Sequence, residues 1–269
     1  MEYVKLKNGV KMPLVGLGTW DLRGKECIET VSQAIQLGYR LIDTAQMYGN
    51  EKEVGLGILK SGIERSDLFV TTKVYRISHS YEKTKKAIDV SLKNLQLDYI
   101  DLLLLHEPYA QGPQMYKALE EAYEEGKLRA IGISNYHEQW YQELMKNCAI
   151  VPMVNQVETH VYFQKWELQK HLQENGTVMQ AWLPLAQGMR NIFKEPILVS
   201  IGEKYQKTSA QVALRFLVQR GISVIPKSKH KQRLLENIDI FDFQLTDEEM
   251  KMIMILDKNK TLFSWTESF

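Results

Sequence analysis

Residues 99–133 read YIDLLLL-HEPYAQG-PQMYKALEEAYEEG-KLRAIGI, and this stretch decides the fold. It passes from a short apolar segment, Tyr99 to Leu105, through an amphipathic segment, 114–125, to a second apolar segment, Leu128 to Ile133. Short apolar runs are typical of strands, the amphipathic period is typical of a helix, and Gly126 ends the helix as glycine commonly does. The stretch therefore predicts a strand–helix–strand unit of a parallel sheet.

The same alternation runs along the chain in both directions from this unit. Near the start, the Asn8-Gly9 turn between the apolar stretches 3–6 and 10–12 predicts a β-hairpin. With the two strands already named, we expect the sheet strands at 14–16, 39–42, 68–72, 99–105, 128–133, 153–156, 178–182 and 223–225. We expect helices at 27–36, 51–60, 82–95, 114–125, 138–146, 164–174, 196–205, 209–219, 230–236 and 246–256.

Eight strand–helix units in 269 residues favour an α/β fold, a (β/α)8 TIM barrel with an N-terminal β-hairpin. Barrels of this kind take about 250 residues as one domain, and no linker-like stretch divides this sequence. We therefore expect a single domain over residues 1–269. The alternative is a doubly wound dinucleotide-binding sheet, but Gly16-Leu17-Gly18-Thr19-Trp20-Asp21 lacks the third glycine of its phosphate-binding fingerprint.

The composition excludes several classes of protein. Hydrophobic residues make up 44% and charged residues 25%, as in ordinary globular proteins. The net charge of +1 gives no basic excess, so we expect no nucleic-acid partner. No apolar run approaches the roughly 20 residues of a membrane span, and the N-terminus does not resemble a signal peptide. With 2 cysteines and no zinc motif, the sequence predicts a cytoplasmic protein without a metal site.

Polar residues follow the predicted strands where each strand ends. In a barrel, these ends meet at one mouth, where functional side chains gather. Tyr48 lies in the loop after Asp43 and reaches the same mouth. The strand-end residues are Asp43, Lys73, His106, Ser134-Asn135 and Asn155-Gln156.

Four of these residues form a set suited to acid chemistry. A carboxylate such as Asp43 holds a buried lysine such as Lys73 in its charged form. The lysine cation favours tyrosinate, so we expect it to lower the pKa of Tyr48 and make it a usable general acid near neutral pH. His106 could donate a hydrogen bond to a carbonyl oxygen. Each residue alone has an ordinary structural interpretation, such as a helix N-cap for Asp43. Their shared position at one mouth favours a catalytic one.

The chain resembles the aldo-keto reductase family from about residue 4 to about residue 260. The loops and short tail are most similar to its bacterial diketogluconate- or glyoxal-reductase-like branch. The matching motifs are Asp43-Thr44-Ala45 with Tyr48 and Asn50-Glu51, Lys73, His106 with Pro108, Gly132-Ile133-Ser134-Asn135-Tyr136, and Ile225-Pro226-Lys227-Ser228 with Arg233 and Glu236-Asn237.

The resemblance implies an NADPH-dependent reductase of small carbonyl substrates that works as a monomer. It implies that Tyr48 donates the proton, that Lys73 paired with Asp43 tunes it, and that His106 positions the carbonyl. It also implies a cofactor site formed by Thr19, Trp20, Ser134, Asn135, Gln156, Trp182, Leu185, Lys227, Ser228, Arg233, Glu236 and Asn237.

Within that site, the resemblance gives each group of residues its own task. Ser134, Asn135 and Gln156 match positions that hold the nicotinamide carboxamide, and Trp182 matches the aromatic residue that stacks on the ring. Lys227, Ser228 and Arg233 match those that grip the 2′-phosphate. Two cations suit a dianion, which favours NADP over NAD. Without the resemblance, the basic segment 227–231 would be interpreted as a solvated helix entry, and the tryptophans as core residues.

Departures from the family pattern affect the substrate pocket. Glu107 stands where tryptophan is usual, and Tyr75 where tryptophan is frequent. With Trp20 they would line a less aromatic, more acidic pocket, shaped further by the tail around Trp265 and Phe269. Two alternatives remain open: a non-catalytic NADP-binding regulatory module of the same fold, and a different barrel enzyme, such as an isomerase or phosphate-handling lyase, whose Lys227 and Arg233 bind a substrate phosphate.

Overall fold

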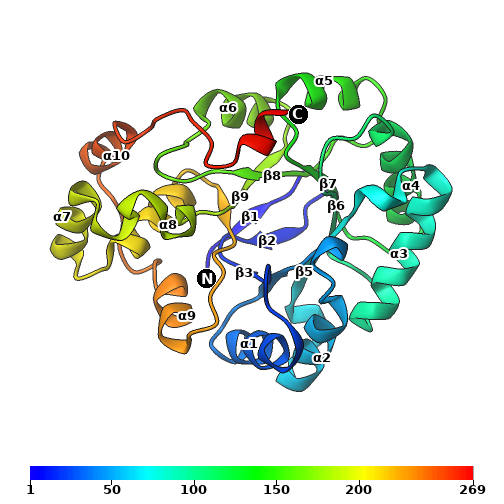
Figure 1. Cartoon of the computed structure of the whole chain (residues 1–269), viewed down its shortest axis with the longest axis horizontal. Coiled ribbons are helices and arrows are strands. Elements are labelled where there is room, and N and C mark those ends of the chain that lie inside the picture. Colours follow the sequence, from blue (N-terminus) through cyan, green and yellow to red (C-terminus); the bar gives the residue numbers. More distant parts are fainter. Residues whose placement is uncertain (269) are drawn as a thin grey trace.

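The structure is a computed structural model that describes residues 1–268, with a small antiparallel hairpin and an eight-stranded parallel sheet (Figure 1). The hairpin strands are β1 (Tyr3–Lys5) and β2 (Lys11–Pro13). The parallel strands follow one another in chain order: β3 (Leu17–Gly18), β4 (Leu41–Asp43), β5 (Phe69–Val74), β6 (Leu102–Leu105), β7 (Ile131–Ser134), β8 (Val154–Glu158), β9 (Val178–Trp182) and β10 (Ser223–Val224).

Helices surround this sheet on its outside (Figure 1). The α-helices are α1 (Gly24–Gln36), α2 (Glu51–Ser61), α3 (Tyr81–Leu95), α4 (Gly112–Glu124), α5 (Glu138–Met145), α6 (Trp166–Glu174), α7 (Pro196–Tyr205), α8 (Ser209–Gln219), α9 (Lys231–Ile238) and α10 (Asp247–Met254). Short 3-10 helices are η1 (Gln46–Tyr48), η2 (Arg65–Asp67), η3 (Arg76–Ser78), η4 (Ala186–Lys194) and η5 (Ser264–Ser268).

The sheet closes on itself where the last strand meets the segment before the first. Val15 and Val224 form a parallel bridge. On either side of it, the Gly16 amide donates to the Val224 carbonyl at 2.8 Å, and the Val224 amide donates to the Leu14 carbonyl at 2.8 Å. The prediction of a (β/α)8 barrel with an N-terminal hairpin is confirmed.

Alternation along the strands separates an inner core from an outer one. Leu102 and Leu104 belong to the inner cluster, whereas Leu103 and Leu105 pack outward against the helices. The hairpin side chains Leu6 and Met12 join the inner cluster with Leu41, Phe69, Leu102 and Met153, which lie at or just before the start of their strands. The hairpin therefore plugs the N-terminal end of the barrel, and the C-terminal strand ends remain available for a site.

Some predicted boundaries are wrong for local reasons. The first barrel strand is Leu17–Gly18 rather than 14–16, because in the segment before it Val15 forms only an isolated bridge to Val224, while the Leu14 amide donates to the Glu2 carbonyl. The helix expected at 164–174 begins at Trp166, because Lys165 has a left-handed φ of 51°. No element was expected at Ala186–Lys194, where non-glycine residues with positive φ leave little sequence signal.

In the part of the chain that the structure describes, no helix combines the length and the apolar character that crossing a membrane requires.

Candidate active site

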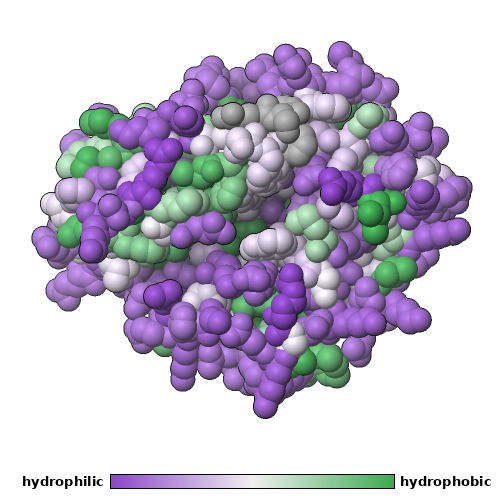
Figure 2. All heavy atoms as spheres, viewed as in Figure 1, coloured by the Kyte–Doolittle hydropathy of each residue, from purple (hydrophilic) through white to green (hydrophobic). Residues whose placement is uncertain are grey.

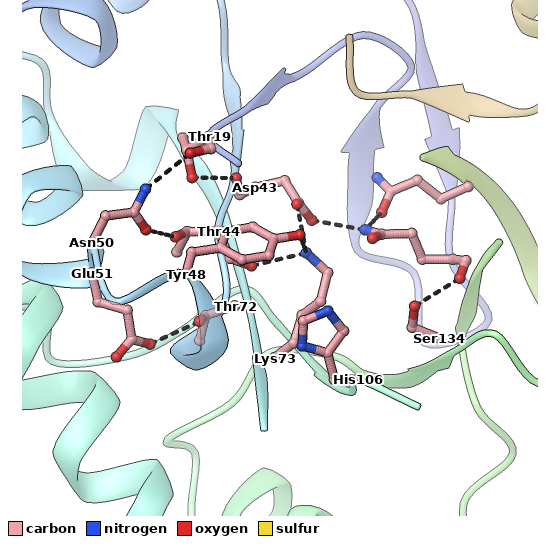
Figure 3. A network of polar contacts seen from close by, with 12 residues as sticks. Thr19, Asp43, Thr44, Tyr48, Asn50, Glu51, Thr72, Lys73, His106 and Ser134 are labelled. Carbon is pink, nitrogen blue, oxygen red and sulfur yellow. Dashed lines mark hydrogen bonds and ion pairs between the residues drawn. The ribbon is translucent and has the colours of Figure 1, made fainter. Parts of the chain in front are cut away.

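Inward-pointing strand ends form a polar ring at the mouth of the barrel (Figure 3). On β4, Leu41 faces the inner core, so alternation also turns Asp43 inward. On β5, Lys73 lies an even number of residues after the inward-facing Phe69, so it also points inward. His106, just after β6, is related in the same way to the inward-facing Leu102. The predicted residues from separate strands therefore converge.

Lys73 is the centre of this ring. Its Nζ donates to Asp43 Oδ1 at 2.6 Å, to the Thr44 carbonyl at 2.9 Å and to the Tyr48 hydroxyl at 3.3 Å. An ammonium group has three hydrogens, so each can serve one of these acceptors. The side chains of Lys73 and Asp43 are 0% and 1% exposed. Lys73 is thus a buried, fully satisfied cation directed at a single phenol.

The turn that carries Tyr48 is fixed by buried hydrogen bonds. The Thr44 hydroxyl donates to Asn50 Oδ1 at 2.7 Å, and Asn50 Nδ2 donates to the Thr19 carbonyl at 2.9 Å. Gly49, at φ 65°, allows the sharp exit from η1. Trp20 packs edge-on against the Tyr48 ring at 4.9 Å between centroids. These contacts hold the phenol over Lys73.

Burial and neighbouring charges shift the pKa values of the residues in this polar ring in opposite directions. Burial lowers the pKa of Lys73, but the Asp43 carboxylate and Tyr48 outweigh it, and the net pKa is raised. Burial raises the pKa of Asp43, against the opposing effects of Lys73 and Gln156. Burial also raises the pKa of Tyr48, more than Lys73 lowers it. The expected lowering of the Tyr48 pKa is therefore wrong, because desolvation of the phenolate exceeds its attraction to Lys73. Tyr48 keeps its proton at neutral pH.

His106 faces Tyr48 across the mouth, with 5.8 Å between ring centroids. Burial, followed by the Lys73 cation, holds the pKa of His106 well below its ordinary value of 6.5. Its Nδ1 is buried and finds no hydrogen-bond partner among residues 1–268. The imidazole is therefore neutral at physiological pH and offers one N–H as a donor.

The predicted substrate residues lie around these groups. The ring centroids of Tyr75 and His106 are 6.2 Å apart, and Trp20, beside Tyr48, is 46% exposed. Glu107 is half-buried, and burial raises its pKa while Arg76 opposes the rise. Figure 2, in the same view as Figure 1, shows a hollow near the centre of this face with hydrophobic residues on one side of it.

Beside the ring lie the residues predicted to hold a nicotinamide. Ser134 Oγ donates to the Gln156 carbonyl at 2.8 Å, and Asn135 Nδ2 donates to the His106 carbonyl at 3.3 Å. Trp182 Nε1 donates to Asn135 Oδ1 at 2.8 Å. The Trp182 ring lies parallel to that of Trp265 at 5.9 Å between centroids. Thus the tail reaches this part of the site, as expected for Trp265, whereas Phe269 lies outside the described residues.

The predicted phosphate residues lie apart from this ring: Lys227 and Ser228 follow β10, and Arg233 lies in the first turn of α9. Lys227 and Arg233 are exposed, and neither has an ion-pair partner in the described chain. Ser228 is buried and accepts from the His230 amide at 3.1 Å. Lys229 instead pairs with Glu26 of α1 at 2.9 Å. Of the remaining positions, Thr19 is buried against the Asp43 carbonyl, Leu185 and Glu236 are half-buried, and Asn237 is buried.

One residue in the ring was missed by the sequence interpretation. Gln180 accepts a hydrogen bond from Gln156 Nε2 at 2.7 Å, and the same nitrogen donates to Asp43 Oδ2 at 2.7 Å. The available signal was a glutamine inside the strand Val178–Trp182, at the same parity as Trp182.

Comparisons with known proteins agree with this geometry. The model of the Aldo/keto reductase family matches residues 14–258. The chain is 46% identical over 264 residues to glyoxal reductase of Bacillus subtilis, covering 96% of this chain and 94% of that protein. An aldo-keto reductase from a Medee basin deep-sea metagenome library is 43% identical, with a TM-score of 0.95 and 97% of each chain covered. A Bombyx mori aldo-keto reductase solved in complex with NADP is 34% identical, with a TM-score of 0.92, covering 97% of this chain and 94% of that one.

Proposed function

Because the chain belongs to the aldo/keto reductase family, we propose that it reduces small aldehydes or ketones to alcohols with NADPH, using Tyr48 as the proton donor. The observation that carries this proposal is the contact of Lys73 Nζ with both Asp43 Oδ1, at 2.6 Å, and the Tyr48 hydroxyl, at 3.3 Å. The similarity to a glyoxal reductase supports small carbonyl compounds as substrates.

The donor set fits NADP(H). Lys227 and Arg233 would hold the 2′-phosphate, since both are exposed cations without carboxylate partners in the described chain. Ser134, Asn135 and Gln156 would hold the carboxamide, and Trp182 would pack on the ring. The structural neighbour bound to NADP supports the same choice. When bound, the cofactor supplies a hydride to the substrate carbonyl carbon.

Side chains of the protein supply the proton and stabilise the charge that its transfer leaves behind. As negative charge develops on the carbonyl oxygen, Tyr48 gives its phenolic proton to that oxygen. The Lys73 ammonium, at 3.3 Å, stabilises the phenolate left behind, and Asp43 keeps the ammonium charged. His106, being neutral, donates its remaining N–H toward the same oxygen and orients the carbonyl. Trp20, Tyr75 and Glu107 would contact the rest of the substrate.

A non-catalytic NADP-binding regulatory module is the alternative. The complete hydrogen-bonded set of Asp43, Lys73 and Tyr48 favours an enzyme over such a module. The family match disfavours the third possibility, an unrelated barrel enzyme.

A carbonyl panel tests the proposal against the module. NADPH oxidation should be measured with methylglyoxal, glyoxal and simple aldehydes and ketones, beside NADH and beside Tyr48→Phe. We expect turnover of several of these with NADPH. If wild-type rates are no higher than those of Tyr48→Phe while NADPH binds tightly, the module is the better description.

We also propose that residues 1–269 form a single domain that works as a cytoplasmic monomer, without a membrane or nucleic-acid partner. Strands spread from Leu17 to Val224 in one sheet support the single domain. Light scattering of the purified protein tests the monomer.

The reduction rate should be insensitive to pH across the neutral range. The active form has Tyr48 protonated and His106 neutral. The pKa of Tyr48 is raised above 10, so this form is lost only when the pH rises into the strongly alkaline range. The pKa of His106 is well below 6.5, so its protonation sets in only at acid pH. We expect kcat at saturating NADPH to be flat from about pH 7 to about pH 9. A decline centred near pH 8 would contradict these directions.

Arg233→Ala should weaken the binding of NADPH by about tenfold or more, the value of one hydrogen-bonded charge pair, and leave NADH binding nearly unchanged. The reason is that the lost guanidinium would contact only the 2′-phosphate. Fluorescence titration of the tryptophans measures both affinities. Lys231→Ala, at an exposed neighbouring position, is the control. Equal weakening of both cofactors by Arg233→Ala would remove Arg233 from the phosphate site.

A further inference from the structure

A chain of buried hydrogen bonds runs from the catalytic ring down the inside of the barrel. Gln156 Nε2 donates to Asp43 Oδ2 and to Gln180 Oε1, both at 2.7 Å. Gln180 Nε2 donates to Ser223 Oγ at 3.1 Å, and Ser223 Oγ donates to the Pro13 carbonyl at 3.1 Å. The strand register places Gln156 beside Gln180, and Gln180 beside Ser223. Gln180 thus connects the hairpin end of the barrel to the active site.

The two ends of this chain fix its direction. The Pro13 carbonyl and the Asp43 carboxylate can only accept hydrogen bonds. Ser223 must therefore donate to Pro13, so it accepts from Gln180 Nε2, and Gln180 turns its Oε1 toward Gln156. An amide nitrogen carries two hydrogens, and those of Gln156 are both used, one on Asp43 and one on Gln180. Because both N–H groups of Gln156 are engaged, its amide cannot flip to exchange the positions of the nitrogen and the oxygen.

This orientation leaves one group of Gln156 available. No donor among the described residues contacts its Oε1. Resting on the proposed function, in which Gln156 holds the nicotinamide carboxamide, we infer that Gln180 is a positioning residue. Gln180 fixes the Gln156 amide so that Oε1 accepts from the carboxamide NH₂ of NADP(H). Gln180 itself is fully buried beside Gln156, with 0% of its surface exposed.

The test compares two cofactors that differ only at the carboxamide. NADP⁺ has the amide NH₂, whereas its 3-acetylpyridine analogue has a methyl group in that place and keeps the carbonyl oxygen. Affinities for both are measured by tryptophan fluorescence for the wild type and for Gln180→Met and Gln180→Leu. Both variants remove the acceptor without adding charge, so either one decides the question if its circular dichroism matches the wild type.

We expect the wild type to prefer NADP⁺ by about fivefold, as one neutral hydrogen bond would give, and both variants to lose that preference. Gln180→Glu keeps an acceptor facing Gln156 and should restore it. Thr177→Val is the structural control. It removes a buried hydroxyl that donates to the Pro152 carbonyl at 2.6 Å, and it should keep the preference.

Other outcomes overturn the inference in distinct ways. An unchanged preference in Gln180→Met and Gln180→Leu would show that Gln180 does not position Gln156. Loss of preference in Thr177→Val as well would assign the effect to general destabilisation. A wild type that binds neither cofactor would contradict the proposed function itself, whereas binding without preference would contradict only the carboxamide contact.

Discussion

Tyr48→Phe should lower kcat for carbonyl reduction by about 10²–10⁴-fold, the usual contribution of a positioned general acid. The substitution removes the proton at the hydroxyl that contacts Lys73 Nζ, at 3.3 Å. His106 cannot replace it as an acid, because its pKa is held well below 6.5 and it is neutral where the enzyme works. Initial rates of NADPH oxidation with methylglyoxal measure the loss.

The fold and the cofactor site should survive this substitution. The ring of Tyr48 packs edge-on against Trp20 at 4.9 Å and His106 at 5.8 Å, and phenylalanine keeps both contacts. We therefore expect unchanged NADPH affinity and a nearly unchanged melting temperature. Tyr141→Phe is the matched control, since it deletes a buried hydroxyl that contacts Thr177 away from the mouth, and it should retain activity. More than a tenth of wild-type kcat in Tyr48→Phe would exclude Tyr48 as the proton donor.

The barrel could be predicted from the sequence because its signals are local and repeated. An apolar strand such as Leu102–Leu105 followed by the amphipathic helix Gly112–Glu124 identifies one unit, and the repetition identifies the fold. The end of each strand was also predictable, so Asp43, Lys73 and His106 could be assigned to one mouth before their distances were known.

Three features had no such signal. The raised pKa of Tyr48 depends on how fully the folded chain buries the phenol, which no spacing of residues reveals. The role of Gln180 depends on the register between β8 and β9, which sets Gln156 beside it. The turns of Ala186–Lys194 depend on non-glycine residues at positive φ, which tertiary contacts must support. In each case, the cause is long-range and appears only when the barrel has closed.

The Lys73–Asp43 pair predicts the largest effect on stability. Lys73→Met should destabilise the fold by about 3–5 kcal/mol, because it leaves the Asp43 carboxylate buried without its cation. This is a large part of a typical free energy of unfolding of about 5–15 kcal/mol. For a chain of this size, each kcal/mol lost lowers the melting temperature by about 2–4 °C. Reduction should be lost as well, because the Tyr48 phenolate would have no cation beside it. Thermal and urea unfolding measure the change in stability.

Adding Asp43→Asn to Lys73→Met separates the two roles of the pair. The double variant has no unpaired buried charge, so we expect it to recover most of the lost stability, while reduction stays absent because the cation is still missing. Lys60→Met is the surface control: Lys60 pairs with Glu29 at 2.5 Å, but both side chains are 49% exposed, so its melting temperature should hardly change. If the double variant is no more stable than Lys73→Met, the loss comes from packing rather than from the uncompensated carboxylate. If it regains activity, the phenolate does not need Lys73, and the proposed proton transfer from Tyr48 would require a different source of stabilisation.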